Sequence, residues 1–302
     1  MTTLADSAPP TAWVIMPFIN NAGLTVDAAQ DVLDQSVRTT LLLVDNGSSD
    51  RTAFNVVQEW ALTKNVRDRV LMWSYPTGFP SLAGIWNRAL QFAWSAGADR
   101  AWVVNNDVRL HPRTLEVLSG VMDYGTAWFV TANSVRSDGW ALFQKQLREV
   151  NDIGAAAVDD YILSIIGDPP RHSGPDFSCF LISRECHKWF QFDERFAPAY
   201  HEDNDYHRRL ELAGLGDRIF GVNFPFLHFG SGTVNAMEPA ARTRFHDKFH
   251  ACQQYYVEKW GGLPHHETYL HPFNAAGGRT LLLGQGRPGV TLEDGVDRPD
   301  WL

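Results

Sequence analysis

The stretch Thr40-Leu-Leu-Leu-Val-Asp-Asn-Gly47 decides the fold. Its apolar run predicts a buried strand over residues 40–44, and the Asp-Asn-Gly that follows is typical of a strand end. Helical spacing starts again directly afterwards, over residues 51–63, with Asp50 as a candidate N-cap. The chain therefore passes from a strand into a helix at this point.

The same alternation extends in both directions from this stretch. It predicts further strands over residues 13–16, 70–75, 101–105 and 127–131, and further helices over residues 26–37, 82–95 and 112–122. This βαβ order predicts an α/β fold with a mostly parallel central sheet flanked by helices.

The second half of the chain is less regular. We expect a helix over residues 141–149 and then a flexible loop that contains Asp168-Pro169-Pro170. After it come a strand (177–183), a short helix (184–190), a helix that ends at Gly214, a strand (220–226) and a long helix (239–260). The tail from Gly261 is rich in glycine and proline, which predicts a segment extended over the surface.

Composition excludes several classes of protein. The 302 residues carry a net charge of −9, from 26 Lys and Arg against 35 Asp and Glu, which argues against a broad nucleic-acid surface. The three cysteines have no CxxC spacing, so we expect neither a zinc site nor a disulfide framework. We find no signal peptide and no apolar run that could span a membrane, and therefore predict a cytoplasmic protein.

Polar clusters follow three of the predicted strands. They are Asn20-Asn21, the stretch from Asp45 to Ser48, and Asn105-Asn106-Asp107. Each cluster alone is more typical of a turn than of a site, but parallel strands bring their carboxyl ends, where ligands bind, to one edge. The chain has no GxGxxG after its first strand and no P-loop, so a bound phosphate would need a divalent cation held by carboxylates.

Taken together and in order, the motifs of residues 12–262 resemble the family 2 glycosyltransferases of the GT-A fold, and especially their rhamnosyltransferase-like branch. The matching segments are Trp13-Val-Ile-Met-Pro-Phe-Ile-Asn20, Leu43-Val-Asp-Asn-Gly-Ser-Ser-Asp50, Val103-Val-Asn-Asn-Asp-Val108, Phe192-Asp-Glu-Arg-Phe196, His201-Glu-Asp-Asn-Asp-Tyr206 with Arg209, His228-Phe-Gly-Ser-Gly232, and Lys259-Trp-Gly-Gly262 with Pro272-Phe-Asn274. The chain departs from the family pattern in Pro76-Thr-Gly-Phe-Pro80 and at Asn105, where many members have Asp.

The resemblance implies a division of the chain. Residues 1–11 would be a flexible N-terminus and residues 12–235 a GT-A catalytic domain. Within that domain, residues 12–132 would bind the nucleotide sugar and residues 133–235 the acceptor. Residues 236–302 would form a C-terminal helix and a surface tail.

The resemblance also implies a donor site for a UDP- or dTDP-sugar. Asp107 and His228 would bind Mn²⁺ or Mg²⁺ at the diphosphate. Asp45 would accept the imide N–H of the pyrimidine, although an Asx turn explains this residue equally well. The residues expected to line the nucleotide site are Pro17, Phe18, Asn20, Asp45, Gly47, Gly78 and Asn106.

For catalysis, the resemblance implies that Asp203 is the general base of an inverting transfer to an acceptor hydroxyl. Glu202 is the second choice for the base, or a residue that holds the acceptor. Trp140 and His201 are candidate acceptor contacts. Asp205 and Arg209 are expected to be structural, because Asp205 lies two residues from Asp203 on a helix.

The resemblance leaves the acceptor open among a glycan, a lipid-linked sugar, a protein side chain and a modified nucleobase. Two other functions compete with glycosyl transfer. A nucleotide-sugar-binding protein without catalysis would explain Asn105. A sugar nucleotidyltransferase would need a basic, glycine-rich loop near the first strand, and residues 20–29 have none.

Overall fold

The computed structural model describes residues 12–48, 51–64, 66, 68–125, 127–167, 177–230, 239–276, 278–290 and 292. In this part of the chain, eight strands form one sheet in the order β3-β2-β1-β4-β7-β6-β8-β5. The strands are β1 (Ala12–Phe18), β2 (Thr39–Asp45), β3 (Val70–Ser74), β4 (Arg100–Val104), β5 (Val108–Arg109), β6 (Phe129–Val135), β7 (Cys179–Ser183) and β8 (Ile219–His228).

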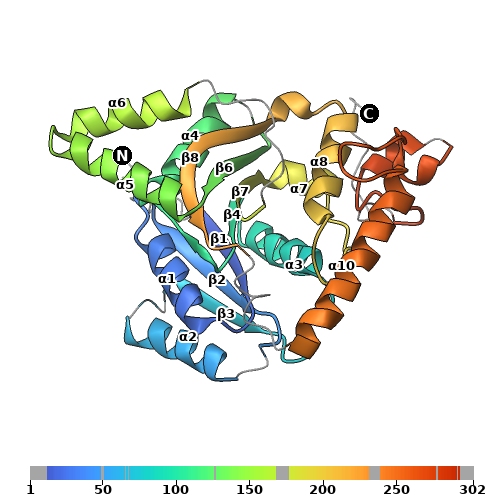
Figure 1. Cartoon of the computed structure of the whole chain (residues 1–302), viewed down its shortest axis with the longest axis horizontal. Coiled ribbons are helices and arrows are strands. Elements are labelled where there is room, and N and C mark those ends of the chain that lie inside the picture. Colours follow the sequence, from blue (N-terminus) through green and yellow to red (C-terminus); the bar gives the residue numbers. More distant parts are fainter. Residues whose placement is uncertain are drawn as a thin grey trace, which may run out of the picture.

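Helices cover both faces of this sheet (Figure 1). They are α1 (Ala22–Leu33), α2 (Arg51–Thr63), α3 (Leu82–Ser95), α4 (Thr114–Gly125), α5 (Ser137–Asn151), α6 (Ala155–Ile166), α7 (Arg184–Trp189), α8 (Glu202–Leu212) and α10 (Pro239–Trp260), with short 3₁₀ helices at Gly216–Arg218, Pro272–Asn274 and Gly278–Leu282.

The sheet is parallel in its first half and mixed in its second. β3, β2, β1 and β4 run parallel, as the βαβ order predicted. β7 then inserts between β4 and β6 and is antiparallel to both. The strand predicted over residues 127–131 forms as β6. It pairs with β8 and β7, and not with β4. Three antiparallel pairings in all make the sheet mixed over this half.

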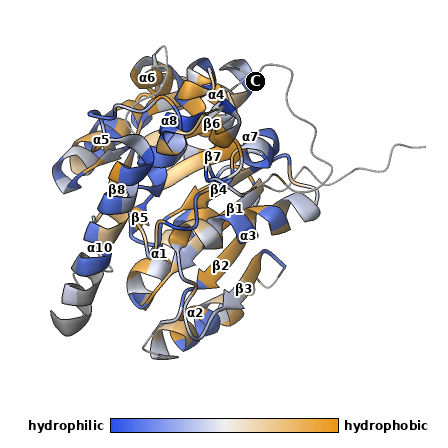
Figure 2. Ribbon diagram, turned by 90° about the vertical axis from the view of Figure 1, so that its right-hand side faces the viewer, coloured by the Kyte–Doolittle hydropathy of each residue, from blue (hydrophilic) through white to orange (hydrophobic). Residues whose placement is uncertain are grey.

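Alternation along each central strand builds two cores. In β1, Val14 and Met16 pack on one face of the sheet and Ile15 packs on the other. In β2, Leu41 and Leu43 alternate with Leu42 in the same way. The strands are apolar on both faces, which Figure 2 shows as orange arrows between helices with hydrophilic outer surfaces.

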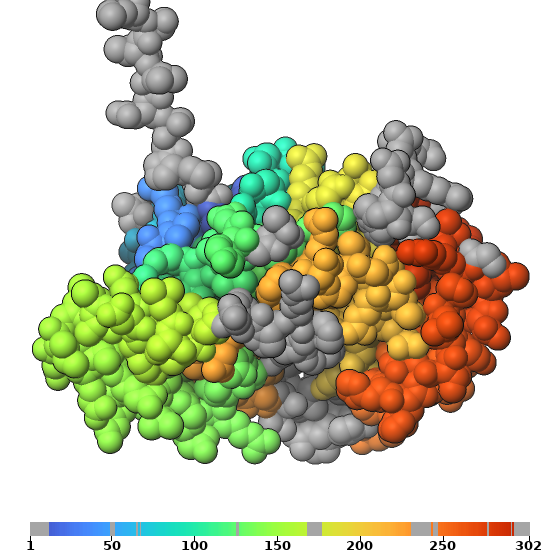
Figure 3. All heavy atoms as spheres, turned by 90° about the horizontal axis from the view of Figure 1, so that it is seen from above, coloured from blue at the N-terminus to red at the C-terminus, as the bar shows by residue number. Residues whose placement is uncertain are grey.

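Two sequence predictions about irregular segments were wrong. Residues 155–166 form helix α6 where we expected a flexible loop, because Ile162 and its apolar neighbours pack into the core beside α5. The two helices form a lobe on the side of the molecule opposite the C-terminal segment (Figure 3).

The described part of the tail is packed into the molecule and not extended over its surface. Leu282 is 1% exposed and Leu283 is also buried, and both belong to the core on the side of α3, α8 and α10. The backbone N–H of Gly284 donates to the Trp189 carbonyl at 2.8 Å. The described part of the tail is thus part of the same folded unit as the sheet and its helices. No helix among the described residues has both the length and the apolar character needed to cross a membrane.

Candidate active site

The loops after β2 and β3 are tied together by the Asp45 carboxylate. Asp45 is 1% exposed, and its Oδ1 accepts hydrogen bonds from the Ser48 backbone N–H and hydroxyl at 3.0 and 2.6 Å. Its Oδ2 accepts one from the Ser74 hydroxyl at 3.1 Å. The turn interpretation of Asp45 is therefore confirmed, and its contact with a pyrimidine stays a prediction.

Gly47 and Gly78 hold these two loops in direct contact. Both have positive φ, 75° and 73°. A Cβ at Gly47 would lie 2.5 Å from the backbone nitrogen of Gly78, which no side chain tolerates. Asn46 completes the junction by accepting the Phe79 backbone N–H through its Oδ1 at 2.6 Å. The predicted nucleotide loops are therefore one rigid unit.

A chain of hydrogen bonds joins this unit to the end of β4. The Asn20 backbone N–H donates to the Ser48 hydroxyl at 2.8 Å. The Thr25 hydroxyl donates to the Asn21 carbonyl at 3.1 Å and accepts from the Asn106 amide at 2.9 Å. Asn20 and Asn21 both adopt left-handed backbone conformations, with φ of 53° and 48°, so α1 begins at Ala22 and not near residue 26.

Asn21 is a site residue that the sequence analysis did not single out for a role. Its side-chain Nδ2 is buried and has no hydrogen-bond partner among the described residues. An unpaired buried donor at the edge where ligands bind suits an anionic or carbonyl oxygen of a ligand. The pair Asn20-Asn21 after the first strand was the available signal.

Pro17 and Phe18 lie within β1 and are buried. Pro17 is in register with Val44 of β2, and the Phe18 carbonyl accepts the Asn46 backbone N–H at 2.8 Å. Their observed contacts are those of a strand that positions the β2 loop. Their contact with a nucleotide stays a prediction.

Asp107 and His228 come together at the far end of the same edge. β5 pairs with β8 so that Val108 opposes His228, and the Phe229 backbone N–H donates to the Asp107 carbonyl at 3.0 Å. The His228 Nε2 lies 3.4 Å from the Asp107 Oδ1. The Ser178 hydroxyl lies 3.4 Å from the other imidazole nitrogen, Nδ1.

Ser178 was not expected here, because only the insertion of β7 beside β4 brings it to this position. The Asn105 backbone N–H donates to the Ser178 carbonyl at 2.8 Å. Because the Ser178 hydroxyl contacts Nδ1 of His228, the other ring nitrogen, Nε2, is directed at Asp107. The contact thereby fixes the orientation of the imidazole ring.

The pair Asp107 and His228 fits a cation that keeps most of its ligands outside the protein. No group of three or more His, Cys, Asp or Glu side chains able to hold a metal occurs in the described part of the chain. Mg²⁺ and Mn²⁺ commonly use one or two protein ligands and complete their shell with water and substrate phosphates. The imidazole favours Mn²⁺ over Mg²⁺. The donor set therefore fits a metal–diphosphate complex better than a closed metal cage.

The carboxylates of α8 lie in contrasting environments. Glu202 is 5% exposed, and its Oε2 has no hydrogen-bond partner among the described residues. Burial, together with the charge of Asp203, raises the pKa of Glu202 to about 8. Asp203 is half-buried and accepts the Asn204 backbone N–H at 2.7 Å. Burial therefore favours the protonated, uncharged form of Glu202.

His201 immediately precedes these carboxylates and caps α8 with a left-handed backbone, φ 68°. Its ring lies 5.3 Å from the ring of Tyr256 and 5.7 Å from that of Phe249. Both ring nitrogens are buried without a partner among the described residues, and burial lowers the pKa of His201. A neutral imidazole with unused polar atoms is compatible with the predicted acceptor contact.

The connection between the end of α8 and the start of β8 is short and contains the 3₁₀ helix Gly216–Arg218. The meeting of Asp203 with Asp107 and His228 in one pocket stays a prediction.

Two further predictions about α8 are confirmed. Asp205 and Arg209 are both fully buried and form an ion pair with Nε and Oδ2 2.9 Å apart. They are structural, as expected from their helical spacing.

The acceptor prediction for Trp140 was wrong. Its side chain is 9% exposed and packs against Phe143, with ring centroids 5.5 Å apart, in the core under α5. Trp140 lies on the apolar face of α5. Its indole therefore packs into the core beneath this helix and is not available to stack on a sugar.

Comparisons with known proteins give structural neighbours only. No protein-family model and no curated protein sequence matches the chain. Solved structures do match. Glucosyl-3-phosphoglycerate synthase from Mycobacterium tuberculosis, in complex with Mn²⁺, UDP and glucosyl-3-phosphoglycerate, superposes with a TM-score of 0.51 at 15% identity, over 82% of this chain and 77% of that one.

The chain has the GT-A fold. The same mycobacterial enzyme with Mg²⁺ and UDP gives a TM-score of 0.50 at 16% identity, over 80% of this chain and 79% of that one. TarS from S. aureus gives a TM-score of 0.50 at 13% identity, over 82% of this chain and 40% of that longer one. The fold class predicted from the motifs is thereby confirmed, and the rhamnosyltransferase-like branch stays a prediction.

Proposed function

We propose that this protein is a metal-dependent inverting glycosyltransferase that uses a UDP- or dTDP-sugar. The observation that carries the proposal is the approach of the Asp107 carboxylate and the His228 imidazole to 3.4 Å at the strand ends of a GT-A fold. They would hold Mn²⁺ or Mg²⁺, which would neutralise the charge of the departing diphosphate. The structural neighbours with Mn²⁺ or Mg²⁺ and UDP support this choice of ligand.

In the proposed reaction, Asp203 removes the proton of the acceptor hydroxyl, and the resulting oxygen attacks C1 of the donor sugar. Attack on the face opposite the diphosphate inverts the anomeric configuration. Asp203 is preferred over Glu202 because a carboxyl group with a pKa of about 8 holds its proton at neutral pH. Glu202 and His201 are assigned to the acceptor side, where a protonated carboxyl and a neutral imidazole can hydrogen-bond a sugar hydroxyl.

The proposal keeps the acceptor classes open. A glycan, a lipid-linked sugar, a protein side chain and a modified nucleobase each offer a nucleophilic oxygen. The three cysteines are free and buried, in keeping with the cytoplasmic location that we predict from the sequence. The proposed division into residues 12–132 for the donor and 133–235 for the acceptor places β8 and α8 in the second part.

A panel of nucleotide sugars in a thermal-shift assay, with and without Mn²⁺, tests the donor. We expect stabilisation by UDP or dTDP compounds only, and only with the metal. Asp107→Asn should lose the metal-dependent shift. The control is Asp99→Asn, which replaces an aspartate with an 83% exposed side chain directly before β4 and should keep the shift. A shift that persists without metal, or that purine nucleotides also give, would contradict the donor assignment.

The competing function is a nucleotide-sugar-binding protein, which Asn105 at the first position of the metal segment favours. Metal-dependent hydrolysis of the donor separates the two functions. We expect slow hydrolysis by the native protein and none by Asp203→Asn, while both bind the donor. Binding without hydrolysis by the native protein would establish the competing function.

A further inference from the structure

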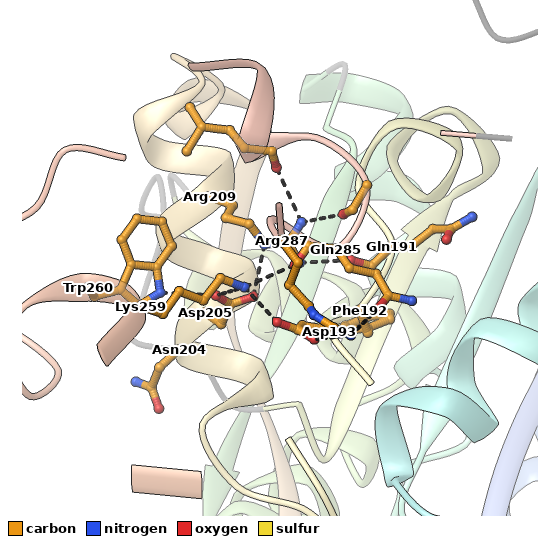
Figure 4. A network of polar contacts seen from close by, with 12 residues as sticks. Gln191, Phe192, Asp193, Asn204, Asp205, Arg209, Lys259, Trp260, Gln285 and Arg287 are labelled. Atoms are coloured by element: carbon orange, nitrogen blue, oxygen red, sulfur yellow. Dashed lines mark hydrogen bonds and ion pairs between the residues drawn. The ribbon is translucent and has the colours of Figure 1, made fainter. Parts of the chain in front are cut away.

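Four fully buried charges meet behind the start of α8. The Lys259 ammonium lies 2.8 Å from the Asp193 Oδ2 and 2.7 Å from the Asp205 Oδ1. Arg209 pairs with the Asp205 Oδ2 at 2.9 Å. Two cations therefore balance two anions, and all four side chains have no exposed surface. Figure 4 shows these side chains converging from α8, α10 and the segment before α8.

The Gln191 carbonyl accepts from the Arg209 Nη2 at 2.7 Å, and the C-terminal segment supplies three further acceptors. The Gly284 and Leu282 carbonyls accept from the Arg209 Nη1 at 2.6 and 3.3 Å. The Gln285 carbonyl accepts from the Lys259 Nζ at 3.0 Å. Arg287 extends toward the same site, with its Nη1 3.7 Å from the Asp193 Oδ1 (Figure 4). Without this segment, buried donors of both cations would lose partners that water cannot replace.

The network holds one face of α8 and leaves the opposite face for chemistry. Asp205 lies in the first turn of α8, and its backbone N–H donates to the His201 carbonyl at 2.9 Å. At 100° per residue, Asp203 points about 200° away from Asp205, roughly to the opposite side. A rotation of α8 that weakens the Asp205 contacts would therefore swing Asp203 by the same angle.

We propose that residues 278–287 are a positioning element that sets the direction of Asp203 by clamping Arg209 and Lys259 behind α8. This inference rests on the proposed function, because it takes Asp203 to be the base. It assigns to the C-terminal segment a part in catalysis that acts through the residues holding α8.

Gly286 of the segment and Gly289 just beyond it provide a matched test. Gly286 has a φ of 63°, and an added Cβ would overlap the Cδ of Arg209 and lie 3.1 Å from the Lys259 Nζ. Gly289 has a φ of 75° and has nothing within 4 Å of an added Cβ. Alanine at either position meets the same left-handed backbone strain, so the difference between the two variants isolates the displacement of Arg209 and Lys259.

The experiment measures metal-dependent donor hydrolysis, its pH profile and the affinity for UDP with Mn²⁺, in the full chain well below its unfolding temperature. For Gly286→Ala we expect kcat to fall at least tenfold, the acidic limb of the pH profile to shift, and the Kd for UDP to change less than twofold. Gly289→Ala should keep the native kcat and pH profile. Equal kcat in the two variants, or a parallel loss of UDP affinity in Gly286→Ala, would overturn the proposal.

A second variant decides the matter if Gly286→Ala does not fold. The Arg287 side chain is 29% exposed, so its removal leaves the fold intact. Arg287→Ala should lower kcat two- to fivefold without affecting UDP binding, and Arg287→Lys should restore it. A native kcat in Arg287→Ala would refute the clamp.

The Asp203→Asn variant separates this inference from the function on which it rests. If Asp203→Asn still hydrolyses the donor, the assignment of the base fails, whatever Gly286→Ala does. If Asp203→Asn is inactive and Gly286→Ala matches Gly289→Ala, only the positioning role fails.

Discussion

Replacing Glu202 by Gln should stabilise the protein in a pH-dependent way. The folded chain raises the pKa of this carboxyl from 4.5 to about 8, mainly through burial. Below pH 4.5 both the folded and the unfolded states hold the proton, so the group does not affect stability. Between pH 4.5 and 8 the unfolded state releases a proton that the folded state retains, and stability falls as the pH rises.

The magnitude follows from about 1.4 kcal/mol for each pH unit in this window. At pH 7 the native glutamate therefore lowers the free energy of unfolding by on the order of 3 kcal/mol relative to a neutral side chain. Glutamine is a neutral isostere of the protonated acid, so Glu202→Gln removes this contribution. Its advantage over the native protein should grow as the pH rises from 4.5 to about 8 and level off above pH 8.

Urea denaturation followed by circular dichroism at several pH values measures this difference. Any packing cost of the amide is independent of pH, so the slope of the difference against pH identifies the titration of Glu202. Glu258→Gln, an exposed glutamate on α10, is the control and should give a difference that does not vary with pH. A flat difference for Glu202→Gln would mean that this carboxyl is ionised in the folded protein, and the choice of Asp203 over Glu202 would lose its basis.

Three other substitutions test the donor side and the buried charges. Gly47→Ala should weaken UDP binding more than tenfold, since its Cβ would lie 2.5 Å from a backbone nitrogen, whereas Gly97→Ala, with φ 92° and open space, should bind UDP normally in a titration. Thr25→Val leaves the Asn106 amide unpaired and should lower the free energy of unfolding by about 1–3 kcal/mol; an unchanged urea midpoint would contradict the hydrogen-bond chain. Lys259→Met removes the cation between the buried carboxylates of Asp193 and Asp205, of which Asp205 keeps its ion pair with Arg209, and should cost about 3–5 kcal/mol, so a loss below about 1 kcal/mol in urea denaturation would rule out the ion pairs of Lys259.

Patterns of a few neighbouring residues predicted those helices and strand ends that depend mainly on their own sequence. The bounds of α2 and α3 were predicted to the residue, because apolar spacing and end signals lie within each helix or next to it. The polar ends of β1, β2 and β4 were also identified, since turn-forming residues interrupt each apolar run. What these patterns lacked was any sign of which strands would be neighbours.

Contacts between segments far apart in the sequence decided the features that the sequence analysis missed. Helix α6 was missed because its stability comes from packing Ile162 into a core formed by other elements. The tail was expected on the surface because its glycines and prolines suggest no regular structure, yet its carbonyls are the acceptors that Arg209 and Lys259 require. Ser178 became a site residue only because β7 inserts beside β4.

The sequence by itself determined an α/β chain with polar strand ends, its GT-A fold, and the residue types at the candidate site. The spacing of apolar residues and the residues that form turns each involve only a few neighbouring positions, so both can be identified from the sequence. The tertiary structure alone decided that Asp107 meets His228, that Glu202 is buried beside Asp203, and that Trp140 is a core residue. Each of these depends on burial and on pairing between distant segments, which set the dielectric environment and the partners of a side chain.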